Sequence, residues 1–90
     1  MKVRFSKEFI EQYKKADVRI RKRVDQQINI FSKNPMDLSL RNHALREEYE
    51  GKRSIGITSN WRAIYREVKF TDDEPYAYFT ALGTHSRLYE

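Results

Sequence analysis

The sequence contains no cysteine, and this absence removes several kinds of chemistry at once. Without cysteine the chain has no disulfide bond, no thiolate nucleophile and no zinc–thiolate site. The absence also fits a reducing compartment. Only two prolines and three glycines are present, so few residues interrupt regular structure and we expect no long linker.

Long apolar runs are missing as well. No run approaches the roughly 18 residues that a membrane-spanning helix needs. Residues 1–30 also lack the apolar centre of a signal peptide. Ninety residues fit one domain. We therefore expect a single domain over residues 1–90 that is cytoplasmic and has no membrane partner.

The charge of the chain points to a class of partner. Eighteen lysines and arginines stand against thirteen acidic residues, which gives a net charge of +5 and an isoelectric point near 9.6. A small basic domain favours a polyanionic partner, and nucleic acid is the commonest one. The alternative is a basic surface that serves only solubility.

The first third of the chain predicts a short strand and two helices. Residues 2–5 alternate between polar and apolar side chains, as a strand does. Ser6 and Asp17 are each suited to cap a helix that follows them. Apolar residues then recur at helical spacing from Ile20 to Phe31, and Asn34-Pro35 ends the second helix. A tight antiparallel helical hairpin is the simplest arrangement.

After Pro35 the hydrophobic period becomes that of strands. We expect strands at residues 45–49, 53–58, 61–70 and 76–82, with Gly83 breaking the last one. Strands that follow a helical hairpin indicate an α+β fold, in which an antiparallel sheet carries the helices on one face. The N-terminal strand needs a partner, and we expect it to pair with a late strand.

Two histidines are the candidates for acid–base chemistry. His43 lies before the expected sheet and His85 follows its last strand. Functional residues often occupy such segment edges on a rigid scaffold. The alternative is that each is an ordinary surface or capping residue, since histidine has many non-catalytic roles.

Cations and aromatic rings alternate in the second half of the chain. Lys52, Arg53, Arg62 and Arg66 lie close in sequence to Tyr49, Trp61 and Tyr65. Single-stranded RNA binding uses this mixture, because cations bind phosphates and rings stack on unpaired bases. The alternative is that the rings belong to the core and the arginines are solvated.

Other chemistries have little support in the sequence. There is no phosphate-binding loop and no glycine-rich dinucleotide motif. The two histidines lack the short spacing of a zinc site. We therefore expect no cofactor and no metal.

Three segments resemble the RelE/ParE superfamily of bacterial toxins, and most closely its YafQ-like branch. They are "KEF" after the first strand, "LREEYEGKRSIGITSNWRAIYR" in the middle and "GTHSRLY" at the end. The resemblance spans nearly the whole chain. It implies a RelE-like α+β fold in which an N-terminal strand and a helical hairpin pack on a twisted antiparallel sheet of four or five strands.

The resemblance also implies an activity and its partners. Because many members are endoribonucleases, it implies a toxin of a type II toxin–antitoxin system that cuts messenger RNA on the ribosome and so inhibits translation. The RNA 2′-hydroxyl attacks the adjacent phosphorus without a metal ion. The implied partners are a cognate antitoxin, the ribosome with its mRNA, and operator DNA only through the antitoxin complex.

Site residues follow from matching positions. The resemblance implies that His85 is the general acid, that His43 acts as base or orients the attacking group, that Arg62 binds phosphate and that Tyr89 stacks on a base. The implied RNA-binding residues are Lys52, Arg53, Asn60, Trp61 and Arg66.

Two positions depart from the YafQ-like pattern. Asn60 stands where that branch has an acidic residue, and Gly56 stands where some relatives carry a further histidine. These departures leave open a non-catalytic RNA-binding relative, and the shared fold leaves open a ParE-like inhibitor of DNA gyrase. The ribonuclease hypothesis requires that His43, Arg62 and His85 converge on one exposed concave face.

Overall fold

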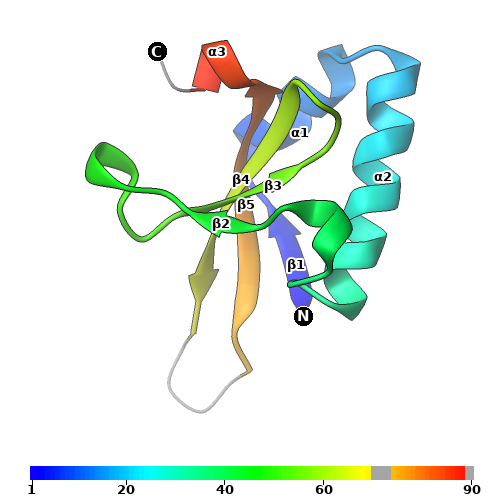
Figure 1. Cartoon of the computed structure of the whole chain (residues 1–90). Helices are drawn as coiled ribbons and strands as arrows, with labels where there is room; N and C mark the ends of the chain where they lie inside the picture. The colour runs from blue at the N-terminus through cyan, green and yellow to red at the C-terminus, as the bar shows by residue number, and fades with distance from the viewer. Residues whose placement is uncertain (70–73, 89–90) are drawn as a thin grey trace.

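The computed structural model describes residues 1–69 and 74–88, and its elements follow the expected order (Figure 1). The strands are β1 (Lys2–Phe5), β2 (His43–Ala44), β3 (Arg53–Gly56), β4 (Trp61–Val68) and β5 (Tyr76–Thr84). The helices are α1 (Lys7–Lys15), α2 (Val18–Lys33) and α3 (His85–Leu88), with short 3₁₀ turns η1 (Leu38–Leu40) and η2 (Glu47–Tyr49).

The helical hairpin begins at the two residues that the sequence indicated. The Ser6 hydroxyl accepts a hydrogen bond from the Phe9 backbone at 3.0 Å, and the Asp17 carboxylate accepts one from Ile20 at 3.1 Å. Each side chain thus satisfies a backbone N–H that has no partner within its helix. The two caps confirm the predicted boundaries of α1 and α2.

The sheet has the strand order β1-β5-β4-β3-β2 and is mostly antiparallel, as expected. The exception is β1, which lies parallel to β5 with Val3 opposite Ala77. Pairing of the first strand with a late strand is therefore confirmed. Its direction was not predictable from periodicity, because alternation of side chains is the same in parallel and antiparallel strands.

The predicted strand at residues 45–49 is wrong. The strand is β2, which begins two residues earlier, and residues 47–49 form the turn η2. Glu47 has a φ of 59°, a left-handed conformation that a strand cannot contain. A second correction concerns Gly83, since β5 continues through it to Thr84.

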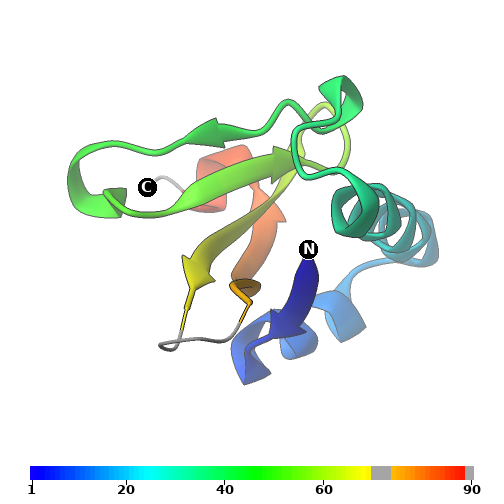
Figure 2. The same cartoon turned by 90° about the horizontal axis from the view of Figure 1, so that it is seen from below.

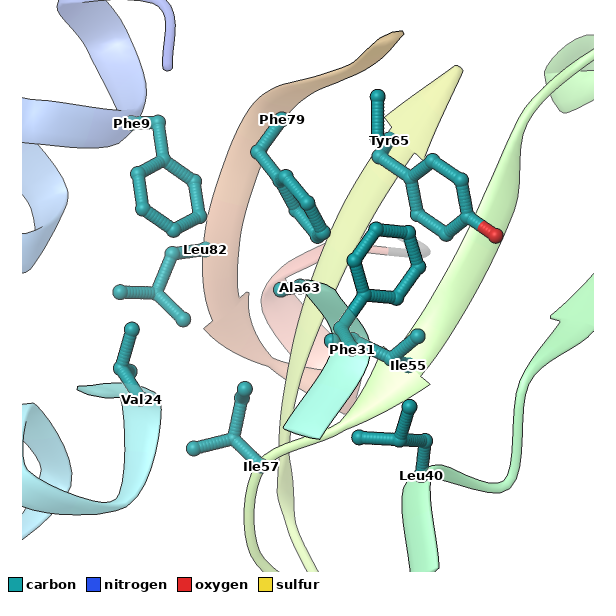
Figure 3. Close-up of a cluster of buried hydrophobic side chains, with 11 residues drawn as sticks. Phe9, Val24, Phe31, Leu40, Ile55, Ile57, Ala63, Tyr65, Phe79 and Leu82 are labelled. Atoms are coloured by element: carbon teal, nitrogen blue, oxygen red, sulfur yellow. The ribbon is translucent and has the colours of Figure 1, made fainter. Parts of the chain in front are cut away.

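The core lies between the helical hairpin and one face of the sheet (Figure 3). The Phe31 ring of α2 meets the Tyr65 ring of β4 at 4.9 Å and the Phe79 ring of β5 at 5.2 Å, both edge to face. Such ring pairs add to the free energy gained from burying their area. Val24 lies on the same side, so the predicted apolar stripe of α2 is the buried one.

The two faces of the sheet carry different elements. Helix α2 lies on the core side, whereas α3 lies on the other side, beside the β2–β3 hairpin (Figure 2). Within the described ranges, no helix combines the length and apolarity that a membrane crossing requires.

Candidate active site

The face of the sheet opposite the core gathers polar residues from three strands, and we call it the outer face. Residues directly opposite each other in an antiparallel pair project to the same side. The pairs are His43 with Ser54, Ser54 with Ile64, Gly56 with Arg62, and Arg62 with Gly83. The register therefore brings the predicted His43 and Arg62 onto one face.

Arg62 is a nearly buried cation at the centre of the outer face. Its side chain is 8% exposed. The guanidinium Nε donates to the Ser54 hydroxyl at 2.6 Å, and Nη2 donates to the Arg41 carbonyl at 3.3 Å. These acceptors hold the planar guanidinium in one orientation. A lysine ammonium on its flexible chain would not be fixed in this way.

His43 touches Arg62 directly. Its Nδ1 lies 3.3 Å from Arg62 Nη2 and 3.1 Å from the Arg41 carbonyl oxygen. The two contacts need opposite tautomers, because a ring nitrogen either donates or accepts. When Nδ1–H donates to the carbonyl, Nε2 carries the lone pair of a base. When Arg62 donates to Nδ1, Nε2 carries the proton in the neutral ring.

His85 is held by its backbone at the end of the same strands. Its N–H donates to the Asn60 carbonyl at 2.8 Å, and its side chain is exposed. Asn60 is two residues before Arg62, and Gly83, the residue opposite Arg62, is two before His85. The backbone of His85 is therefore anchored at the margin of the outer face.

The short helix α3 is tied to the β2–β3 hairpin. The Tyr49 hydroxyl donates to the Leu88 carbonyl at 2.9 Å. Leu88 also lies close above Gly83, where an added Cβ would meet its Cδ2 at 3.4 Å. These contacts keep α3 next to Gly83 of β5, the residue opposite Arg62. Convergence of His85 with His43 and Arg62 in a concave site stays a prediction.

Other predicted RNA-binding residues lie away from this contact. Arg53 projects to the core side, where its Nε donates to the Asn42 side chain at 2.9 Å. Trp61 is partly buried against the core, which agrees with the alternative that the rings belong there. The structure does not bring these two together with His43.

The remaining predicted residues are exposed or lie beside rings. Asn60 is exposed in the turn before β4. Lys52 Nζ lies 5.9 Å from the centre of the Tyr49 ring, and the Arg66 guanidinium lies 5.7 Å from that of Tyr78. Tyr89 lies outside the described residues. Among the described side chains, no group of three or more histidines and carboxylates is arranged to hold a metal ion.

Sequence reasoning missed two residues of this site. Ser54 falls within the expected strand at residues 53–58, but its contact with Arg62 depends on the register of β3 against β4. Arg41 has a left-handed backbone with φ 48° and ψ 46°, which no pattern in the sequence signals. Its carbonyl oxygen lies within hydrogen-bonding distance of both Arg62 and His43 because of that conformation.

The fold is that of RelE-like toxins, as comparison with solved structures shows. YafQ from E. coli strain BL21(DE3) is 22% identical, with a TM-score of 0.77 over 98% of this chain and 97% of that chain. A YoeB/ParE toxin from Agrobacterium tumefaciens is 18% identical, with a TM-score of 0.77 over 94% and 99% of the two chains.

Another structure, the conserved protein HP0894 from Helicobacter pylori, is 26% identical, with a TM-score of 0.67 over 99% of each chain. Residues 1–90 match the family described as the bacterial toxin of type II toxin–antitoxin system, YafQ. The chain belongs to this family. No curated protein sequence matches it significantly.

Proposed function

We propose that this YafQ-family toxin is a ribosome-dependent endoribonuclease that cuts messenger RNA and so stops translation in the cytoplasm. The observation that carries the proposal is the contact of His43 with the buried guanidinium of Arg62, at 3.3 Å. A fixed cation beside a titratable ring is suited to a phosphodiester whose neighbouring hydroxyl must lose a proton.

The proposed reaction is an internal transfer at phosphorus. His43 takes the proton from the RNA 2′-hydroxyl, and the 2′-oxygen forms a bond to the adjacent phosphorus. The bond from phosphorus to the 5′-oxygen breaks, and His85 supplies the proton that this oxygen needs. The products are a 2′,3′-cyclic phosphate and a 5′-hydroxyl end, and the proton count balances.

Arg62 contributes to this reaction through charge. Its guanidinium stabilises the additional negative charge of the five-coordinate phosphorus. Removing one fixed donor of this kind from an active site typically lowers the rate by about 10²–10³-fold. General acid–base assistance adds roughly 10²–10⁴-fold. Because Arg62 is already held by Ser54 at 2.6 Å, little reorientation is needed when RNA binds.

The proposed protein partner is a cognate antitoxin. Several structures with this fold are toxin–antitoxin complexes, among them DinJ-YafQ from E. coli and RelBE2 from Mycobacterium tuberculosis. On this chain, an apolar groove of about 610 Å³ lies between β1, α1 and α2. Phe5 and Ile10 line it and are 38% and 41% exposed. Exposed apolar grooves of this kind favour a protein partner, and we assign this one to the antitoxin.

One experiment tests the ribonuclease proposal in growing cells. Wild type, His85→Ala, His43→Ala and the neighbouring control Ser86→Ala are induced, and the 5′ ends of messenger RNA are mapped. We expect new 5′-hydroxyl ends with wild type and Ser86→Ala, and their loss with either histidine variant. Equal cleavage by wild type and His85→Ala would refute the role of His85.

A second experiment separates the ribonuclease from a gyrase inhibitor. If wild type stops growth without new mRNA ends, the ribonuclease proposal fails. Purified wild type is then added to a DNA supercoiling assay, where inhibition would identify the ParE-like activity. RNA binding with no cleavage on translating ribosomes would identify a non-catalytic relative.

The antitoxin groove has its own test. Ile10→Asp places a charge in the groove, whereas Val18→Asp places one at a residue that is 54% exposed and does not line it. We expect Ile10→Asp to lose co-purification with a co-expressed cognate antitoxin and Val18→Asp to keep it. Equal retention of the antitoxin by both variants would contradict the assignment.

A further inference from the structure

Arg41 has an unusual backbone conformation directly beside the site. It is the residue that ends η1, and its φ of 48° and ψ of 46° lie in the left-handed region. This conformation is sterically unfavourable for a residue with a Cβ. The conformation directs the Arg41 carbonyl toward Arg62 and His43. The unfavourable backbone geometry therefore helps to position these two side chains.

The Arg41 side chain, in contrast, crosses β3 on the outer face. Its Nη2 donates to the Thr58 carbonyl at 3.0 Å. The guanidinium also lies directly over Gly56, where an added Cβ would be 2.5 Å from Nη2 and 3.1 Å from Cζ. Any larger residue at position 56 would displace the guanidinium, so Gly56 provides the space that Arg41 occupies.

The register places the residue beneath the Arg41 guanidinium beside the strand position of Arg62. Gly56 lies directly opposite Arg62 in the β3–β4 pair, and opposite Cα atoms in such pairs are about 4.5–5.5 Å apart. Both guanidinium groups thus lie on the outer face, where they add their positive charge. A phosphodiester bound to both would be attracted by both charges.

The two arginines differ in access to solvent. Arg62 is 8% exposed, whereas the Arg41 side chain belongs to the exposed class. A guanidinium carries five N–H donors in a fixed fork that matches phosphate oxygens, and the Thr58 carbonyl engages one of these donors. Arg41 is thus the member of the pair that an approaching polyanion meets first.

From these observations we propose that Arg41 is a second phosphate-binding residue, which contacts the RNA backbone beside Arg62 with Gly56 as its support. The proposal rests on the proposed function, since it assigns the outer face to RNA. The role proposed for Arg41 is to bind the substrate, not to transfer a proton. The competing explanation is that Arg41 only caps the Thr58 carbonyl.

Binding to an RNA that cannot be cleaved separates these explanations. The probe is a fluorescent 2′-O-methyl RNA oligonucleotide, which lacks the attacking hydroxyl, and its affinity is measured by anisotropy over a range of salt concentrations. The variant Arg41→Asn removes the charge but tolerates the left-handed backbone. Arg19→Asn makes the same change on α2, on the other side of the sheet, and serves as the control.

We expect Arg41→Asn to lower the slope of log affinity against log salt by about 0.7, which corresponds to about a fivefold loss of affinity at 0.1 M salt. Arg41→Lys should restore part of the affinity, because it keeps the charge but not the fork. If Arg41→Asn binds the probe with the affinity and slope of Arg19→Asn, the proposal is overturned.

A second variant keeps the test valid if Arg41→Asn folds poorly. Gly56→Ala retains both charges but pushes the Arg41 guanidinium aside, and this shift is inexpensive because the contact is with the end of a flexible side chain. We expect a wild-type melting temperature and weaker probe binding. Unchanged binding by Gly56→Ala would overturn the proposal.

The two proposals can fail separately. If wild type cuts no mRNA but the Arg41 variant still binds the probe more weakly, the ribonuclease activity is refuted and the role of Arg41 stands.

Discussion

Replacing Ser54 by alanine tests whether the outer face holds Arg62 in place. The Ser54 side chain is fully buried, and its hydroxyl accepts from Arg62 Nε at 2.6 Å. Hydrogen bonds to charged groups contribute about 1.5–3 kcal/mol, and the substitution leaves a buried donor without this acceptor. We therefore expect Ser54→Ala to lower the free energy of unfolding by about 2 kcal/mol.

This loss of stability lowers the melting temperature by an amount that is readily measured. For a domain of this size about 1 kcal/mol shifts the midpoint by roughly 4–8 °C, so the expected fall is roughly 8–16 °C by circular dichroism. The control is Ser32→Ala, which removes only a hydrogen bond to the Asn29 carbonyl within α2 and at the half-buried surface. Surface changes of this kind usually stay within about 0.5 kcal/mol.

The rate of the proposed RNA cleavage should also fall, but its cause differs from that of the lower folding stability. In the proposed reaction a loosened Arg62 would stabilise the transition state less, and each 1.4 kcal/mol lost there is about a tenfold lower rate. The double variant Ser54→Ala/Arg62→Met isolates the contact, because Ser54→Ala should cost clearly less once the guanidinium is absent. Strictly additive effects, or a Ser54→Ala melting temperature equal to that of Ser32→Ala, would refute the reasoning.

Three further changes probe the support of the site. Gln27 is 2% exposed and donates to the Gly56 carbonyl at 2.9 Å, so Gln27→Leu should lower the free energy of unfolding in urea by about 1–3 kcal/mol, because that carbonyl loses its donor. Tyr49→Phe removes the bond to Leu88 at 2.9 Å and should speed amide hydrogen exchange in residues 85–88 and slow cleavage. The Ser39 side chain and backbone lower the pKa of Asp37 below 3.8. Its stabilising contribution is therefore complete above about pH 3.8 and is lost as the pH falls through the folded-state pKa. Urea unfolding below that pH should depend less on pH in Asp37→Asn than in wild type.

The caps and the core were predictable because they depend on neighbours in the chain. Ser6 and Asp17 act within three residues of themselves, and the stripe of α2 follows from the helical period. The same local reasoning failed around residues 43–49. A short strand such as β2 forms only where β3 offers a partner, and the left-handed Glu47 redirects the chain after it.

The same distinction between local and long-range contacts applies to the candidate site. The residue types were visible in the sequence: histidines at the edges of the sheet and cations among aromatic rings. The partners of Arg62 were not visible, because Ser54, Arg41 and His43 reach it across 8 to 21 residues of sequence. Trp61 and Arg53 lie near these residues in sequence but face the core side.

The sequence by itself determined that the chain would be a small basic α+β domain and which residue types could bind and cleave RNA. Tertiary structure decided which of them meet. Strand register selects the face that each side chain occupies, and a shift of one residue would place Arg62 in the core. The left-handed turn at Arg41 and the space over Gly56 then fix where the two guanidinium groups lie. Both features depend on contacts between distant segments, so only the folded chain contains them.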